Sequence, residues 1–241
     1  MTLSEPEIGA LIATLARTSG LAATSPVIGD QGVSTRARLV FVLAVTFCVG
    51  MTRAPVELSA IPAVVILELA IGLITGLTAR IVMSRVAIAG QLMGVSVGLG
   101  FAAQYDVHAG ESAGVLRSLL TAIASLAFLS AGGLEALVRG IAVAPVADIS
   151  QLSDLGPAFV HHATAAFGQG LALSAPILLA AFVGNVALAV MNRAAPAVNV
   201  FSIALAAVLV IGGLVLLATA AHMIGATIDT SRAAIDVLGG A

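Results

Sequence analysis

The chain has few charged and few aromatic residues. Of its 241 residues, 9% are charged and 4% are aromatic, with no Trp and one Tyr, whereas 60% are hydrophobic. A soluble domain carries about 25% charged residues, so this composition excludes an ordinary soluble protein. It predicts a polytopic membrane protein or a subunit buried in a membrane-associated assembly. The missing aromatic belt at the bilayer interface indicates contact with other proteins more than with lipid.

The scarcity of charge and cysteine excludes further classes of protein. A net charge of −2 provides no basic surface for nucleic acid. Cys48 is the single cysteine, so an intrachain disulfide is impossible. The sequence has no Walker-type glycine loop, so we expect this chain to hydrolyse no nucleotide.

The hydrophobic residues fall into seven segments, and none alternates as a strand does, so we predict an all-α fold. A bilayer span needs about 20 apolar residues, and several segments are too short or too charged to be conventional spans. We expect one helical domain over residues 1–241, a break at Arg80–Arg85, a loop at 145–157 and a short amphipathic tail at 224–241. The segments are 8–23, 39–51, 58–79, 86–103, 115–131 (continuing to 144), 170–190 and 200–221.

A polar corner separates the last two segments. Asn192, Arg193, Pro196 and Asn199 lie within eight residues, and Phe201 follows them. Pro196 lacks a backbone donor and disfavours helix at the residue before it. A charged, proline-broken corner between apolar helices belongs at a membrane surface or inside a protein assembly.

Glycines recur at four-residue spacing in two segments. Gly72 and Gly76 share one helix face, and Gly90, Gly94 and Gly98 share another. Small residues at this spacing let a second backbone approach to van der Waals contact. The pattern predicts close packing, either within the chain or at an interface between subunits.

The stretch 98–111 combines glycines with two aromatic and three ionisable residues. Phe101, Tyr105 and Asp106 stand in its middle. One interpretation is a mobile gate or plug whose aromatic rings close a passage. The other is a surface loop anchored by those rings.

Glu68 is the main intramembrane charge, and such charges usually mark function. We consider Arg17, Arg117 and Arg139 as possible partners. In a proton-coupled transporter Glu68 would be the relay, whereas in a packed assembly it would be a satisfied contact between helices. The absence of a second relay group favours packing.

The sequence offers no convincing catalytic or metal site. Ser96 lies in the G-x-S-x-G pattern of residues 94–98, but that motif requires a strand-to-helix turn and Ser96 is expected mid-helix. His161 and His162 are adjacent and point to different helix faces without a third ligand at useful spacing. We therefore expect no enzyme activity, no metal and no cofactor.

Several motifs together resemble the FliR/SctT family, the R/T subunit of the type III secretion export gate. Residues 68–73 (ELAIGL) resemble the family's E-x-x-x-G-L segment. Residues 89–101, followed by Asp106, resemble its A-G-(Q/E)-x-x-G-x-x-x-G-L-x-F stretch. Residues 192–201 (NRAAPAVNVF) are close to its N-R-x-A-P-Q-x-N-x-F signature. The order and spacing of these motifs extend over about residues 35–220. The family's Asp-Pro, N-G-H and Gln positions are replaced here, at Val107, at residues 131–133 and at Ala197.

The resemblance implies a non-enzymatic subunit of the type III protein export gate of a flagellum or injectisome. It implies P/R-type, Q/S-type and B/U-type partner subunits, unfolded export substrates, and a place in the bacterial inner membrane and the flagellar basal body. Phe101, Tyr105 and Asp106 would then belong to a channel plug at 101–111. Residues of the glycine faces and of the corner would serve helix packing or subunit contact: Glu68, Gly72, Gly90, Gly94, Gly98, Asn192, Arg193, Pro196, Asn199 and Phe201. The competing class is a proton-coupled small-molecule transporter, which predicts internal repeats that the two halves do not show.

Overall fold

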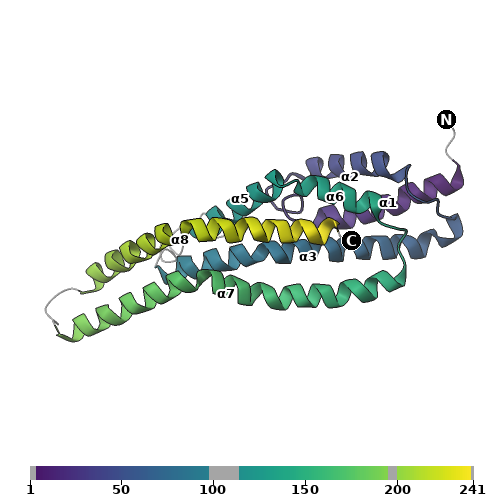
Figure 1. Ribbon diagram of the computed structural model, residues 1–241. Helices are drawn as coiled ribbons and strands as arrows, with labels where there is room; N and C mark the ends of the chain where they lie inside the picture. The colour runs from purple at the N-terminus through teal and green to yellow at the C-terminus, as the bar shows by residue number, and fades with distance from the viewer. Residues whose placement is uncertain (1–3, 98–113, 195–199, 240–241) are drawn as a thin grey trace. The chain divides into compact units, whose positions relative to one another are not determined.

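The computed structural model describes residues 4–97, 114–194 and 200–239, shown as ribbons in Figure 1. Within these ranges the chain forms seven α-helices and one short 3-10 helix and contains no strand, so the all-α prediction is confirmed. In chain order the elements are α1 (Glu5–Thr24), α2 (Thr35–Gly50), η1 (Leu58–Ala60), α3 (Ile61–Ser96), α5 (Val115–Ser130), α6 (Gly133–Val143), α7 (Ile149–Ala194) and α8 (Val200–Gly239).

The first two helices begin at serine caps. The backbone N–H of Ser4 donates to the Glu7 carboxylate at 2.7 Å, at the start of α1. At the start of α2, the Ser34 hydroxyl accepts from the backbone N–H of Ala37 at 3.3 Å. These bonds satisfy backbone groups that the first turn of a helix leaves without partners.

Three helix boundaries predicted from the sequence are wrong, because the observed helices are longer. Arg80 and Arg85 lie inside the continuous helix α3, since arginine is almost as good a helix former as leucine. The expected loop at 145–157 ends at Asp148, and Pro157 lies inside α7. Proline costs one backbone bond, a loss that long apolar helices tolerate when neighbouring groups compensate. The tail 224–241 continues α8, because Gly225 alone is too weak a breaker to end a helix.

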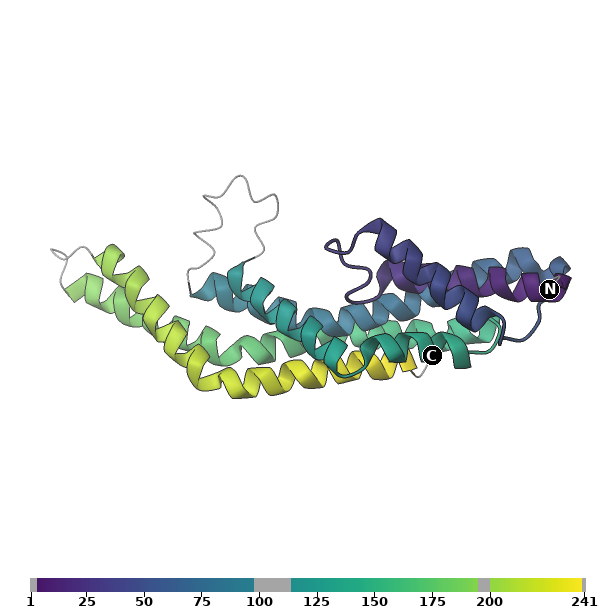
Figure 2. The ribbon, with the colours of Figure 1, turned by 90° about the horizontal axis from the view of Figure 1, so that it is seen from above.

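The chain divides into two compact units. The first comprises residues 1–83, 127–165 and 231–241. In it α1 and α2 lie against each other, as Figure 2 shows. Leu21 of α1, Val45 of α2, Phe128 of α5, Ile141 of α6 and Leu238 of α8 belong to one buried apolar cluster. Segments distant in sequence therefore share one core.

The second unit comprises residues 84–126 and 166–230. Here glycines bring helices to α3. A Cβ at Gly90 of α3 would lie 2.7 Å from the Cα of Arg117 on α5. A Cβ at Gly170 of α7 would lie 2.9 Å from the carbonyl oxygen of Arg85, and one at Gly212 of α8 would lie 2.6 Å from the Val97 side chain. Only glycine permits approaches this close.

Among the described residues, three helices are long and apolar enough to cross a membrane: α3, α7 over Ile149–Arg193, and α8 over Leu209–Leu238. The pair α5 and α6, bent by 56°, would be a fourth span if it crosses as one unit. Of the apolar window of α8, only 11% is buried inside the chain. The described residues are therefore those of a polytopic helical protein whose apolar surface requires lipid or other proteins.

Gly72 and Gly94 allow a matched test of helix packing. A Cβ at Gly72 would collide with the carbonyl oxygen of Arg17, whereas one at Gly94 would meet no described atom within 4 Å. We predict that Gly72→Ala lowers the free energy of unfolding by about 1–3 kcal/mol through overpacking. Gly94→Ala should be neutral or stabilising by up to about 1 kcal/mol, because alanine favours helix. Thermal unfolding of the detergent-solubilised chain measures both, and equal melting temperatures would contradict the packing role of Gly72.

Candidate functional site

Glu68 of α3 is fully buried and is bonded on both carboxylate oxygens. Its Oε2 accepts from Nε of Arg17, which lies on α1 and is 3% exposed. Its Oε1 accepts from Nη2 of Arg53 at 3.0 Å and from the backbone N–H of Ala147 at 3.1 Å. One carboxylate thus joins α1, the connection after α2 and the connection between α6 and α7 to α3.

Arg53 extends this cluster to backbone carbonyls. Its Nη2 also donates to the carbonyl oxygens of Ala144 at 3.2 Å and of Pro145 at 2.9 Å. Both acceptors follow the end of α6, where the last carbonyls of a helix lack partners within the helix. The guanidinium therefore caps α6 while it pairs with Glu68.

The cluster is rich in positive charge. It contains two guanidinium groups and one carboxylate, all with side chains at most 4% exposed. Burial lowers the pKa of Arg17 from its ordinary value, and the Glu68 carboxylate acts in the opposite direction. Arginine nevertheless stays protonated in proteins. Removal of Glu68 would leave two buried cations without their counter-ion, which is far more costly than the loss of a surface pair.

Glycines on both helices explain why Arg17 reaches Glu68. Gly72 lies one turn after Glu68 and faces the backbone of Arg17. On α1, a Cβ at Gly20 would lie 2.6 Å from the carbonyl oxygen of Leu69. Further along the same contact, the hydroxyl of Thr24 donates to the carbonyl of Leu73 at 3.0 Å. The two helices therefore touch through their backbones, which leaves the ion pair no room for intervening water.

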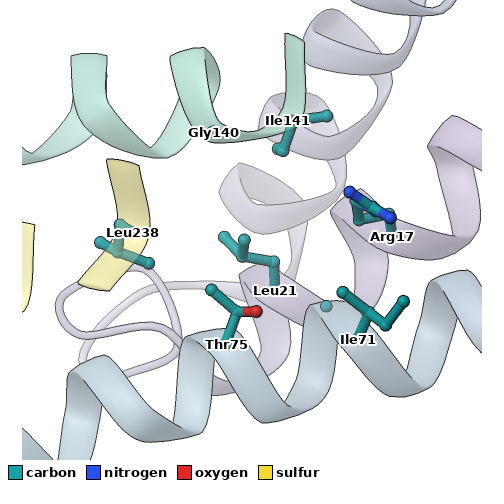
Figure 3. A pocket seen from close by; sticks show the side chains of 8 residues that line it. Arg17, Leu21, Ile71, Thr75, Gly140, Ile141 and Leu238 are labelled. Atoms are coloured by element: carbon teal, nitrogen blue, oxygen red, sulfur yellow. The ribbon is translucent and has the colours of Figure 1, made fainter. Parts of the chain in front are cut away.

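A small cavity lies beside the cluster, and Figure 3 shows its lining. Arg17, Thr75 and Ile71 border it, together with residues of α6 and α8. Its volume of about 10 Å³ matches the space that one water molecule occupies. Arg17 Nη2 and the Thr75 hydroxyl are both buried without a hydrogen-bond partner among the described residues. A bound water here would satisfy both groups.

The structure describes only part of the predicted site. Asn192 and Arg193 lie near the end of α7, and both are exposed. Gly90 contacts α5, whereas Gly94 faces open space among the described atoms. Phe201 lies in α8, and its side chain is not described. The remaining predicted residues fall outside the described ranges: Gly98, Phe101, Tyr105, Asp106, Pro196 and Asn199.

Of the three arginines considered for Glu68, Arg17 is confirmed as a partner. Arg139 instead pairs with Glu135 at 2.7 Å on an exposed face, and Arg117 is exposed. Sequence reasoning missed Arg53, which appeared to be an ordinary loop residue two positions before Pro55. The chain has only ten basic residues, so considering each of them as a counter-ion for Glu68 would have included Arg53.

Neither the G-x-S-x-G pattern nor the histidine pair forms a catalytic or metal site among the described residues. The Ser96 hydroxyl donates to the carbonyl of Leu92 at 2.7 Å inside α3, so Ser96 is not on a strand-to-helix turn. The rings of His161 and His162 lie edge to face with centroids 5.5 Å apart. The described part of the chain has no group of three or more potential metal-ligating His, Cys, Asp or Glu residues.

Comparison with known proteins identifies similar sequences over most of the chain. The family profile described as "Bacterial export proteins, family 1" matches residues 8–233. Flagellar biosynthetic protein FliR of Escherichia coli (strain K12) is 26% identical over 206 residues, covering 82% of this chain and 79% of that protein. FliR of Caulobacter vibrioides is 27% identical over 200 residues, covering 78% of this chain and 79% of that protein. FliR of Aquifex aeolicus is 31% identical over 154 residues, which cover 62% and 59% of the two chains.

The two Glu residues in ion pairs provide a direct comparison of burial. Glu68 is fully buried, whereas Glu135 is 71% exposed in its pair with Arg139. We predict that Glu68→Gln lowers the free energy of unfolding by about 3–5 kcal/mol, because it leaves two buried guanidinium groups unneutralised. Glu135→Gln should cost less than about 1 kcal/mol. Thermal unfolding and protease resistance of the purified chain measure the difference, and a Glu68→Gln variant as stable as Glu135→Gln would refute the counter-ion role.

Proposed function

The chain belongs to the bacterial export proteins, family 1, and from this premise we propose that it is a non-enzymatic subunit of the flagellar protein export gate. The observation that carries the proposal is the family match over residues 8–233, which covers nearly the whole chain rather than one motif. The similar proteins from Escherichia coli, Caulobacter vibrioides and Aquifex aeolicus are all named for flagellar biosynthesis. The chain would help to form the channel through which unfolded flagellar proteins leave the cell.

The location that fits this role is the bacterial inner membrane, within the flagellar basal body. Three long apolar helices support a multi-pass arrangement. Their outward surfaces carry large exposed apolar side chains, among them Phe182 of α7 at 65% and Leu217 of α8 at 76%. Such surfaces are stable only against lipid or other apolar protein.

The partners would be the P/R-type, Q/S-type and B/U-type subunits of the gate. Asn192 and Arg193 support this role for the corner, because both are exposed at the end of a long apolar helix. A charge in that position needs a polar neighbour or a membrane surface. We propose that the corner contacts a neighbouring subunit, and that the glycine face of α3 holds the chain itself together.

The bonding of Glu68 argues against a proton-coupled transporter. A relay carboxylate must exchange its proton, whereas both oxygens of Glu68 accept bonds from buried arginines. Glu68 therefore suits a structural role, which fits a channel subunit driven by other components.

We also propose that residues 101–111 form the plug of the channel. The support is the resemblance of residues 89–101 and Asp106 to the family pattern. Phe101 and Tyr105 supply large rings on either side of three small or polar residues. Two rings at this spacing would close a narrow passage by their bulk alone, without a covalent bond or an ion pair.

The export function is testable in a bacterium whose own copy of the gene has been deleted. We expect loss of secreted flagellar subunits and of swimming, restored by the wild-type chain. Arg193→Asp should abolish co-purification with the partner subunits, because it reverses the charge at the corner, whereas Arg139→Asp should leave it intact, since Arg139 lies in an exposed pair within this chain. Normal secretion in the deletion strain would overturn the export function. Intact complexes from Arg193→Asp would overturn the corner contact alone.

The plug predicts a change in ion leakage. Replacement of Phe101 and Tyr105 together by Ala should raise the conductance of the assembled gate to small ions, because the side chains that fill the passage are shortened. Conductance of the purified complex in planar bilayers is the measurement, and Phe167→Ala, at a position 61% exposed on α7, is the matched control. Unchanged leakage in the double variant would remove the plug assignment.

A further inference from the structure

We propose that the small cavity beside Glu68 binds a monatomic anion of the halide class, chloride, rather than a water molecule. All of the residues that line this cavity belong to the first unit. Such an ion would bind whether or not the chain acts in protein export, and its site needs no assumption about the position of a membrane.

The cluster of Arg17, Arg53 and Glu68 has an excess of positive charge. Its one carboxylate neutralises at most one of the two guanidinium groups, and all three side chains are at most 4% exposed. Among the described residues, no second carboxylate lies within ion-pair distance of either arginine. A buried charge without a counter-ion is costly, because the protein interior solvates it poorly. A bound anion would reduce that cost.

The cluster also has more hydrogen-bond donors than acceptors. Nη2 of Arg17, Nε and Nη1 of Arg53 and the hydroxyl of Thr75 are all buried without a partner among the described residues. Arg17 borders the cavity from α1 and Thr75 borders it from α3, as Figure 3 shows. A guanidinium donates hydrogen bonds and never accepts them. An anion accepts from every donor that it meets, and such charge-assisted bonds are about twice as strong as neutral ones.

The rest of the cavity wall is apolar, which favours an anion over water. A buried water molecule makes about three hydrogen bonds. Among the lining side chains, only the Thr75 hydroxyl could accept one of its hydrogens. A halide has no hydrogens that need acceptors. The other lining residues are Leu21, Ile71, Gly72, Gly140, Ile141 and Leu238.

The size of the cavity selects a monatomic ion. The centre of a water-sized sphere can occupy about 10 Å³ of it, so a particle slightly larger than water also fits. Phosphate, sulfate and carboxylates each contain several heavy atoms and need more room. The walls cannot easily spread, because Gly72 packs against the backbone of α1 and Gly140 packs against the backbone of α8. Chloride meets these limits on size, charge and bonding together.

The test is thermal unfolding of the purified full-length chain in detergent, with sodium chloride replaced stepwise by sodium gluconate at constant ionic strength. Gluconate is too large for the cavity and therefore controls for general effects of salt. An ion that binds only the folded chain stabilises it in a saturable manner. We expect the melting temperature to rise by about 2–4 °C when the chloride concentration is about fivefold above its dissociation constant.

Thr75 and Thr78 provide a matched pair of variants. Both lie on α3 and are 3% exposed, but the Thr78 hydroxyl already donates to the carbonyl of Ile74 at 2.7 Å. Thr75→Val removes one donor and keeps the shape of the side chain, so it should weaken chloride binding about tenfold. Thr78→Val should leave the chloride dependence unchanged. Arg17 is kept in both variants, since its removal would also break the ion pair with Glu68.

Two results would overturn the anion site. A wild-type melting temperature that does not depend on chloride at constant ionic strength would leave water as the occupant of the cavity. A chloride dependence that Thr75→Val retains in full would show that the ion binds elsewhere on the chain. Both are measured without secretion, so failure of the anion site is distinguishable from failure of the export function.

Discussion

The first unit depends on the neutralisation of one buried carboxylate. Glu68 has no exposed surface, and a carboxylate in such surroundings is stable only with close counter-charges and hydrogen bonds. Arg17, Arg53 and the backbone N–H of Ala147 supply them from three separate stretches of chain. Because no one of these bonds is local in sequence, the bonding of Glu68 selects the arrangement in which α1 and the α6–α7 connection both meet α3.

The same scarcity of polarity leaves much of the surface apolar. The apolar windows of α3, α7 and α8 are buried inside the chain by at most a third. The chain therefore cannot bury all of its apolar surface by itself, and lipid or partner subunits must cover those helix faces. Polar groups persist at a few positions, such as the exposed Arg193 at the end of α7 and the cavity lined by Arg85, Gln169 and Asp229. The proposed assembly role rests on this exposed apolar surface.

Particular residues show how far sequence reasoning reached. Glu68 stands out because it is a charge within an apolar run, and Arg17 was among its proposed partners. Arg53 was missed, because a charged side chain in a loop usually points to water. Its burial depends on distant acceptors, the carbonyl oxygens of Ala144 and Pro145. The break expected at Arg80–Arg85 does not occur. Two arginines lower the local hydropathy of the sequence, but they leave the backbone hydrogen bonds of the helix intact. Gly72 and Gly90 lie at close helix contacts, whereas a Cβ at Gly94 would meet no described neighbour, because spacing alone does not say which glycine faces another helix.

By itself the sequence determined the all-α class, the long apolar helices and the membership of an export-protein family. These depend on composition, on periodicity and on the order of motifs, all of which are properties of the chain read in one dimension. Only the tertiary structure decided which arginines neutralise Glu68, which glycines carry a helix contact, and that Arg85, Gln169 and Asp229 share a cavity. The reason is physical: electrostatic pairing and steric contact depend on distances of a few ångströms between residues dozens of positions apart, and no local pattern encodes those distances.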